Sequence, residues 1–60
     1  MSWERHSKYR GADVWIDRAG ATIQWAYTWP IDGISVTPRG ADASSLSGLR
    51  RAIRHDGEVA

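Results

Sequence analysis

The stretch TIQWAYTWPIDGISV, residues 22–36, decides the fold. A large apolar side chain stands at every second position of its first half, at Ile23, Trp25, Tyr27 and Trp29. This period of two, rich in aromatic residues, predicts a β-strand over residues 22–29 with these side chains on one face. Pro30 cannot donate a hydrogen bond to a sheet, and the run Pro-Ile-Asp-Gly favours a tight turn directly after the strand.

Two further segments carry strand patterns. DVWIDR, residues 13–18, alternates in the same way, and Ala19-Gly20 after it suits a short hairpin connection. ISVT, residues 34–37, predicts a third, shorter strand that ends at Pro38. The segment PRGADAS that follows is typical of a loop.

The last part of the chain changes period. Leu46, Leu49 and Ile53 have the i, i+3, i+7 spacing of the apolar stripe of a helix. Asp42 and Ser44 are candidate N-caps, and Asp56-Gly57 is a candidate end of the helix. Gly48 inside the helix either allows a close approach to the sheet or lowers the stability of the helix.

These elements predict an α+β fold of β-β-β-α order. A three-stranded antiparallel sheet is followed by one C-terminal helix, which packs on one face of the sheet. We expect residues 11–57 to form this single domain, with a basic N-terminal arm over 1–10 and a tail over 58–60. The expected core joins the apolar sheet face to the helix stripe: Val14, Ile16, Ile23, Trp25, Tyr27, Ile34 and Val36 under Leu46, Leu49 and Ile53. Trp29 is expected to lie at the end of the sheet, next to Pro30.

The bulk properties narrow the class of protein. The chain has 60 residues, four tryptophans, no cysteine and a net charge of +1. A domain of this size is marginal in stability without a staple or a partner. We therefore expect the arm to dock on the aromatic face, or two copies to form a homodimer that covers it. No apolar run is long enough to cross a bilayer, and the lack of cysteine fits a reducing compartment, so we expect a soluble cytoplasmic protein without membrane contact.

The sequence contains no catalytic constellation. His6 and His55 lie near opposite ends, and their spacing matches no metal-binding motif. No glycine-rich loop leads from a strand into a helix, as a phosphate cradle of the nucleotide-binding kind requires. We expect a protein that is not an enzyme and that uses neither a metal nor a cofactor.

Two basic segments indicate a nucleic-acid partner. Arg5, Lys8 and Arg10 alternate with Trp3 and Tyr9, a composition that suits contact with phosphates and stacking on bases. In the helix, the basic residues lie on one flank of the apolar stripe: Arg50, Arg51 and Arg54. Cations near a helix C-terminus are also expected simply because they complement the helix dipole.

The sheet face away from the helix is the last candidate. Trp15 is its one large apolar residue, and Gln24 is a polar side chain suited to reading a base edge. We expect both to affect sequence preference if this face enters a groove. The leading hypothesis is a nucleic-acid-binding regulatory or accessory protein of a bacterium, phage or mobile element. The alternative is a protein-binding module, an inhibitor or an antitoxin-like partner, that uses Trp15 or Trp29.

Two resemblances accompany this interpretation. The order of three strands and one helix resembles the small DNA-binding domains at the N-terminus of some tyrosine integrases and in plant AP2 factors, which lay the helix-free sheet face in the major groove. The stretch WPIDGISVTPRGADASSLSGLRRAI, residues 29–53, looks like the strand-loop-helix of HicB-type antitoxins. Neither resemblance includes a diagnostic motif, and no family is assigned.

Overall fold

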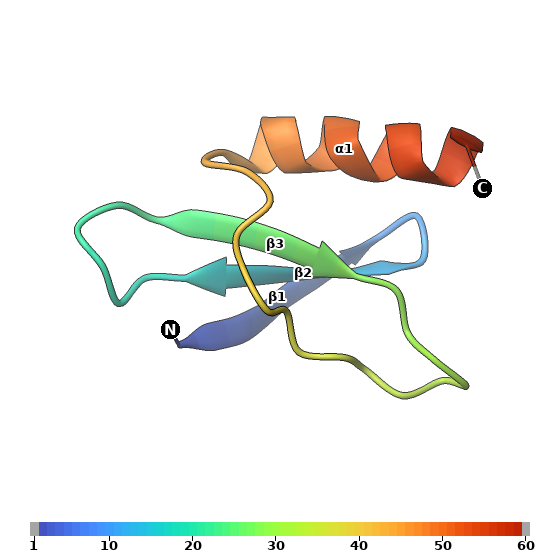
Figure 1. Ribbon diagram of the computed structural model, residues 1–60, viewed down its shortest axis with the longest axis horizontal. Helices are drawn as coiled ribbons and strands as arrows, with labels where there is room; N and C mark the ends of the chain where they lie inside the picture. The colour runs from blue at the N-terminus through green and yellow to red at the C-terminus, as the bar shows by residue number, and fades with distance from the viewer. Residues whose placement is uncertain (1, 60) are drawn as a thin grey trace.

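The described part of the chain contains three strands and one helix. The computed structural model describes residues 2–59, with Val59 described by its backbone alone. The elements are β1 (Trp3–Tyr9), β2 (Ala12–Asp17), β3 (Gln24–Thr28) and α1 (Leu46–Val59) (Figure 1). The strands form one antiparallel sheet in the order β1-β2-β3, and α1 packs along β3 on one face of it. This confirms the predicted α+β class; α1 is too short and too polar to cross a membrane.

The first strand is the segment that the sequence presented as a basic arm. Trp3–Tyr9 pairs with β2 from Trp3 opposite Asp17 to Tyr9 opposite Ala12. A two-residue turn at Arg10-Gly11 joins the strands, with the positive φ angles of 52° and 90° that a type I′ hairpin needs. Met1 and Ala60, the outermost residues of the predicted arm and tail, lie outside the described residues.

The predicted strand over residues 34–37 is wrong. This segment is irregular, and only Ile31 and Ile34 bridge each other across the Asp32-Gly33 turn, through two backbone hydrogen bonds of 3.0 and 2.9 Å. The free edge of β3 is occupied instead by Asp42 and Ala43. Trp25 exchanges backbone hydrogen bonds of 2.8 to 3.1 Å with them, and Asp42 Oδ2 accepts from Tyr27 N at 3.0 Å. The segment 34–37 therefore cannot pair with this edge of β3, because Asp42 and Ala43 already occupy it.

A β-bulge at His6 sets the faces of β1. The register shifts between Arg5 and Ser7, so His6 is the extra residue. Strict alternation would place Tyr9 on the same face as Trp3 and Arg5, whereas the bulge moves Tyr9 to the face under the helix. The His6 ring itself packs edge-on against Trp25, with ring centroids 5.0 Å apart.

The core lies between the sheet and α1. Ala12 and Val14 of β2 are fully buried with Leu49 and Ile53 of the helix. Partly buried side chains surround them: Tyr9, Trp25, Tyr27, Ala43 and Leu46. The expected pairing of Val14, Trp25 and Tyr27 with the helix stripe is therefore confirmed.

Two residues of the expected core are exposed. Ile23 is 50% exposed because β3 begins only at Gln24, so Ile23 belongs to the preceding connection. Ile34 is 69% exposed because it closes the Asp32-Gly33 turn rather than a strand. Val36 is half-buried, and Ile16 is buried as expected.

The face away from the helix is also covered. In Figure 1 the connection between β3 and α1 passes below the sheet before it climbs to the helix. Asp13, Trp15 and Ala26 are buried on this side, and Arg5 Nη1 donates to Ser35 Oγ of the connection at 3.4 Å. The expected exposure of Trp15 is therefore wrong: it is 9% exposed, and its Nε1 donates to Thr28 Oγ1 at 2.9 Å.

The helix begins at Leu46, one residue later than a cap at Ser44 and three residues later than a cap at Asp42 would place its start. Ser45 is the N-cap, since its Oγ accepts from Gly48 N at 3.1 Å, which is the usual side-chain bond at this position. A Cβ on Gly48 would stand 3.1 Å from the same Oγ, so glycine here leaves room for the cap. The helix continues past Asp56-Gly57 to Val59, because Gly57 does not adopt the left-handed conformation that ends many helices.

Candidate nucleic-acid interface

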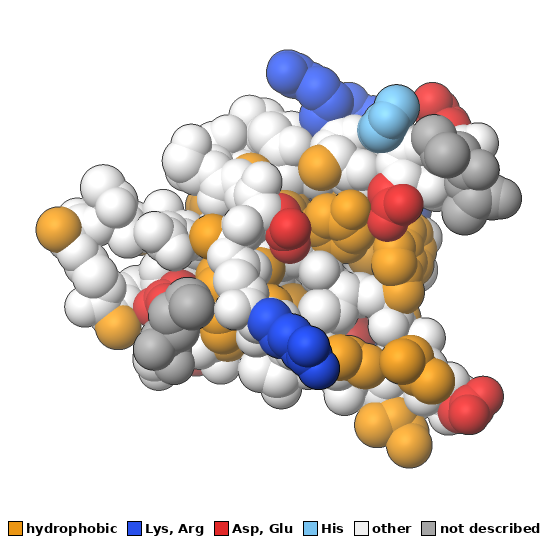
Figure 2. All heavy atoms as spheres, in the orientation of Figure 1, with side chains coloured by type: hydrophobic (Ala, Val, Ile, Leu, Met, Phe, Trp, Pro, Cys, Tyr) orange, Lys and Arg blue, Asp and Glu red, His pale blue; other side chains and the backbone are white. Residues whose placement is uncertain are grey.

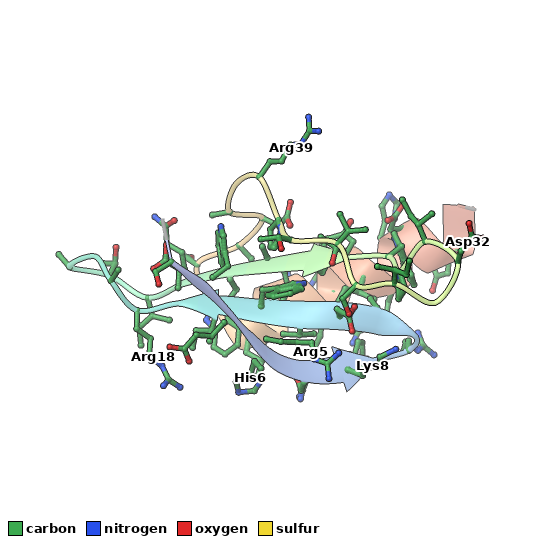
Figure 3. The ribbon with its side chains drawn as sticks, turned by 90° about the horizontal axis from the view of Figure 1, so that it is seen from below. Arg5, His6, Lys8, Arg18, Asp32 and Arg39 are labelled. Carbon is green, nitrogen blue, oxygen red and sulfur yellow. The ribbon has the colours of Figure 1, made fainter. Side chains whose placement is uncertain are left out.

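The structure divides the predicted site residues between two faces. Arg5 and Lys8 lie on the helix-free face, where Figure 3 shows them close together on β1. Arg10, in the β1–β2 turn, lies instead on the helix side with Arg54. Trp15 is buried, and Gln24 is exposed near the opposite end of the sheet.

Tyr9 connects the hairpin to the arginines of the helix. Arg54 Nη1 donates to the Tyr9 hydroxyl oxygen at 3.1 Å, and the guanidinium carbon of Arg50 lies 5.3 Å from the centre of the Tyr9 ring. The positions i and i+4 place both arginines on the same side of α1. We call Arg10, Arg50 and Arg54, together with Tyr9, the arginine cluster. Arg51 is exposed and, by helix geometry, faces away from the sheet.

The phenol of Tyr9 responds to this charge. The hydrogen bond from Arg54 lowers the pKa of Tyr9 below 10.0, and desolvation opposes it. The positive charges of Arg54, Arg10 and Arg50 lower the same pKa further. All three arginines therefore act on the Tyr9 phenol, although Arg10 lies 40 or more residues before the others in the 60-residue chain.

The basic residues on the other face are engaged with a carboxylate. Arg5 Nη1 and Lys8 Nζ lie 3.8 and 3.9 Å from Asp13 Oδ1, and the Asp13 side chain is fully buried. Within residues 2–59, no other ion pairs are present. The guanidinium groups of the arginine cluster are therefore free of acidic partners in this part of the chain, whereas Arg5 and Lys8 are partly neutralised.

A hollow of about 290 Å³ adjoins the cluster at the end of α1. It is lined by Arg10, Trp29, Ile53, Arg54, Gly57 and Glu58. Trp29 is 39% exposed, and its Nε1 donates to Asp56 Oδ2 at 2.7 Å. We call this feature the helix-end hollow. Figure 2 shows hydrophobic side chains reaching the surface below this end of the helix.

Asp56 orders the aromatic side chains beside the hollow. The same Oδ2 accepts from the Tyr27 hydroxyl at 3.2 Å, and the Tyr27 and Trp29 rings meet edge to face at 6.2 Å. Desolvation raises the pKa of Tyr27, and the hydrogen bond to Asp56 and the charges of Asp56 and Asp42 raise it further. The orientation of the Trp29 indole is thus held from two sides.

The sequence indicates Tyr9 as a base-stacking residue of the basic arm but does not place it beside the helix arginines. Its position under the helix depends on the bulge at His6, which has no side-chain signature. The sequence predicts that Trp29 lies at the end of the sheet and contacts a protein partner. Its alternation with Trp25 and Tyr27 was the one available signal that it would remain near the helix.

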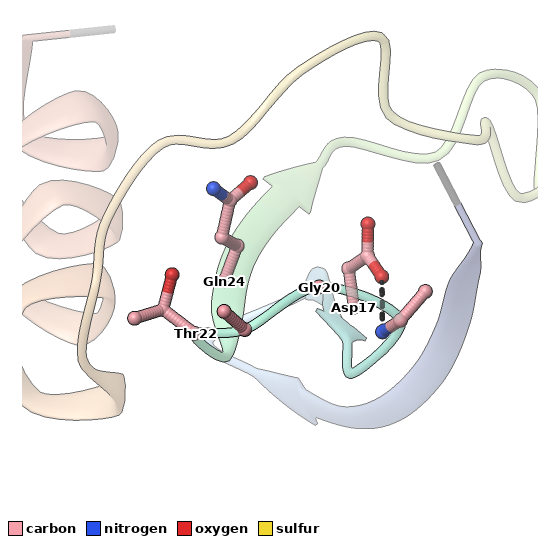
Figure 4. Close-up of a pocket in the computed structure, with 6 residues that line it drawn as sticks. Asp17, Gly20, Thr22 and Gln24 are labelled. Carbon is pink, nitrogen blue, oxygen red and sulfur yellow. Dashed lines mark hydrogen bonds between the residues drawn. The ribbon is translucent and has the colours of Figure 1, made fainter.

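A second hollow, of about 400 Å³, lies at the connection between β2 and β3 (Figure 4). Asp17, Thr22 and Gln24 contribute its polar side chains. The Asp17 carboxylate accepts from Ala19 N at 2.9 Å and Ser2 N at 3.4 Å, so it serves the local backbone. No grouping of three or more metal-ligating side chains occurs within the described residues.

An apolar turn projects from the connection between β3 and α1. Ile31 and Ile34 are 64% and 69% exposed on either side of the Asp32-Gly33 turn. Figure 2 shows hydrophobic side chains at the lower right, where this turn lies in Figure 1. We call Ile31 and Ile34 the isoleucine tip.

Comparison with protein families, with curated proteins and with solved structures found no match. The geometry of the chain itself is therefore the basis of the functional proposal.

Proposed function

We propose that this protein binds nucleic acid through the arginine cluster. The observation that carries the proposal is the convergence of Arg10 with Arg50 and Arg54 around the Tyr9 ring, free of acidic partners within residues 2–59. Converging guanidinium groups suit phosphate oxygens, which accept charge-assisted hydrogen bonds from their fork of donors. The role proposed for the protein is therefore binding, without enzymatic activity.

The proposed interface is narrower than the sequence alone suggested. Arg5 and Lys8 face Asp13 on the opposite side of the sheet, and Trp15 is buried. None of these three residues is therefore part of the proposed interface. Gln24 lies at the far end of the sheet and is also left out. Arg51 faces outward, so it adds to the positive electrostatic potential around the helix but is not part of the arginine cluster.

Arg10→Asn tests the proposal without weakening the fold. Asn-Gly is a preferred pair for a type I′ turn, so the variant removes one charge while it suits the positive φ of residue 10 better than arginine does. We expect an unchanged or higher melting temperature together with weaker binding. On a single strand, the slope of log affinity against log salt should shrink by about 0.7 for the lost phosphate contact.

A double variant with a charge-matched control extends the test. Arg50→Gln with Arg54→Gln should reduce the slope by about 1.4 on a single strand, since two contacts are lost. Arg18→Gln with Arg39→Gln removes the same charge from side chains that point away from the sheet in Figure 3, and the slope should persist. Fluorescence anisotropy with a labelled oligonucleotide measures both. Equal losses in the two double variants, or no binding at low salt by the intact protein, would overturn the proposal.

A second candidate function is binding to a protein partner. The observation that favours it is the isoleucine tip, because two exposed isoleucines on an ordered turn are costly in water and suit an apolar pocket. Such a partner includes a second copy of this chain, and the homodimer stays a prediction that sedimentation of the intact protein and of the Ile31→Ser, Ile34→Ser variant can check. The cytoplasmic location, and a regulatory role in a bacterium, phage or mobile element, likewise stay predictions.

A further inference from the structure

The helix-end hollow combines three kinds of surface in one place. The buried side chain of Ile53 forms an apolar floor, the 39% exposed Trp29 indole forms a wall, and Arg10 and Arg54 stand at the rim. Trp29 is held by Asp56 at its nitrogen and by the edge contact with Tyr27, so its ring does not need to be ordered when a ligand arrives. A fixed aromatic wall loses little entropy on stacking.

The charges around the hollow select what can enter it. Glu58 lines the hollow, and Asp56 lies behind the Trp29 indole, so these two negative charges disfavour a phosphate inside the hollow. Phosphates are favoured on the arginine side of the rim instead. A neutral, flat and largely apolar group suits the hollow itself, and a nucleobase joined to a phosphate chain has both properties.

We propose that the helix-end hollow receives one unstacked base of a single-stranded nucleic acid, which stacks on the Trp29 indole while its flanking phosphates contact Arg10 and Arg54. The inference rests on the proposed function, because two of the cluster arginines also form the rim. In a duplex the bases are stacked on one another and their faces are not available, so the ligand must be single-stranded.

Gly57 allows the hollow to be filled without disturbing the fold. A Cβ at Gly57 would meet no atom within 4 Å, and its φ lies outside the left-handed region. Gly57→Leu therefore places a side chain into the hollow while it raises helix propensity. We expect the affinity for a single-stranded oligonucleotide to fall about tenfold, since stacking on one aromatic side chain contributes a factor of this order. Gly57→Ala, which adds only a methyl group, is the matched control and should bind as the intact protein does.

The wall is tested with a second pair of variants. Trp29→Leu should lose about tenfold in affinity, and Trp29→Phe should retain most of it, because phenylalanine keeps a face for stacking but not the bond to Asp56. A purely structural role for Trp29 would instead make both variants lose melting temperature and affinity together.

An oligomer of abasic deoxyribose phosphate separates the two proposals. The intact protein should bind it about tenfold more weakly than a base-bearing strand, and Gly57→Leu should bind both alike. Equal binding of the abasic and base-bearing strands, with a normal salt slope, would overturn the stacking inference and leave the arginine cluster as a phosphate site. Failure to bind either strand at low salt would overturn both. Equal affinity of the intact protein for duplex and single strands would also contradict the stacking inference.

Discussion

The indole nitrogen of Trp29 donates a 2.7 Å hydrogen bond to Asp56, joining the end of β3 to the last turns of α1. Tyr27 donates to the same carboxylate oxygen at 3.2 Å. Because α1 touches the sheet chiefly through β3, this pair of bonds holds the C-terminal half of the helix in place. It also orients the ring that faces the helix-end hollow.

Asp56→Ala should lower the free energy of unfolding by about 2 kcal/mol. Hydrogen bonds to a charged acceptor contribute roughly 1.5–3 kcal/mol each, and partial exposure together with the unfavourable position of an acid near a helix C-terminus reduces the sum. In a domain of this size the melting temperature should fall by roughly 10 °C. Asp56→Asn keeps one acceptor oxygen and should lose about half as much. If the thermal unfolding curve of the alanine variant overlays that of the parent, the contact does not stabilise the fold.

The pKa values of the two tyrosines should be shifted in opposite directions from the ordinary value of 10.0. Arg54 holds the pKa of Tyr9 below it, and burial holds the pKa of Tyr27 above it. Ultraviolet absorbance of the tyrosinate should therefore rise in two steps, and Tyr9→Phe should remove the earlier one. Arg54→Gln should move the earlier step to higher pH. A single step that Arg54→Gln leaves unchanged contradicts the geometry at Tyr9.

These shifts also fix how each tyrosine contributes to stability. The pKa of Tyr9 is lowered on folding, so its contribution is present above pH 10.0 and is lost as the pH falls through its folded value. Tyr27 has a raised pKa, so its contribution is present below pH 10.0 and is lost as the pH rises through its folded value. Denaturant unfolding of Tyr27→Phe across alkaline pH should show a weaker loss of stability than the parent.

The buried Asp13 makes the stability of the protein depend on the two cations on the helix-free face, Arg5 and Lys8. Its carboxylate is fully buried, and within residues 2–59 neither oxygen has a hydrogen-bond partner and only Arg5 and Lys8 compensate its charge. Arg5→Gln with Lys8→Gln should cost about 1–2 kcal/mol, less than for a fully buried pair because both cations are more than half exposed. Adding Asp13→Asn should recover most of this loss. Simple additivity of the three changes in denaturant unfolding would show that the charges do not interact.

Deletion of His6 should be tolerated, although it removes a residue from within a strand. Arg5 already pairs with Trp15 and Ser7 with Val14, so the shortened strand forms a regular ladder with the same faces. We expect a cooperative melt, lowered by the lost contact between His6 and Trp25. Deletion of Ala26 from the regular ladder of β3 is the control, since it turns the flanking side chains over and should abolish folding. Unfolding of both variants would contradict the assigned bulge.

The helix and the strands β2 and β3 were predictable because their patterns are local. The i, i+3, i+7 stripe of Leu46, Leu49 and Ile53 leaves one face to bury, and alternation at Trp25 and Tyr27 sets the face that receives it. The Asp32-Gly33 turn followed from the preference of these residues for positive φ, and the structure has 52° and 76° there.

The arm and the arginine cluster were not predictable in the same way. Trp3–Tyr9 has a polar sequence, and it is a strand because its backbone groups pair with β2, which depends weakly on side-chain type at an edge. Arg10 meets Arg50 and Arg54 only after the hairpin closes and the helix docks.

The sequence by itself determined the α+β class, the phase of β2 and β3 and the buried stripe of the helix, since each follows from periodicity within a few residues. Only the tertiary structure decided which segment became the third strand, that Trp15 is buried, and that Tyr9 faces the helix. The physical reason is that backbone pairing at a sheet edge, a one-residue bulge and the path of a long connection are set by contacts between distant segments. Their energies do not appear in any local pattern of residues.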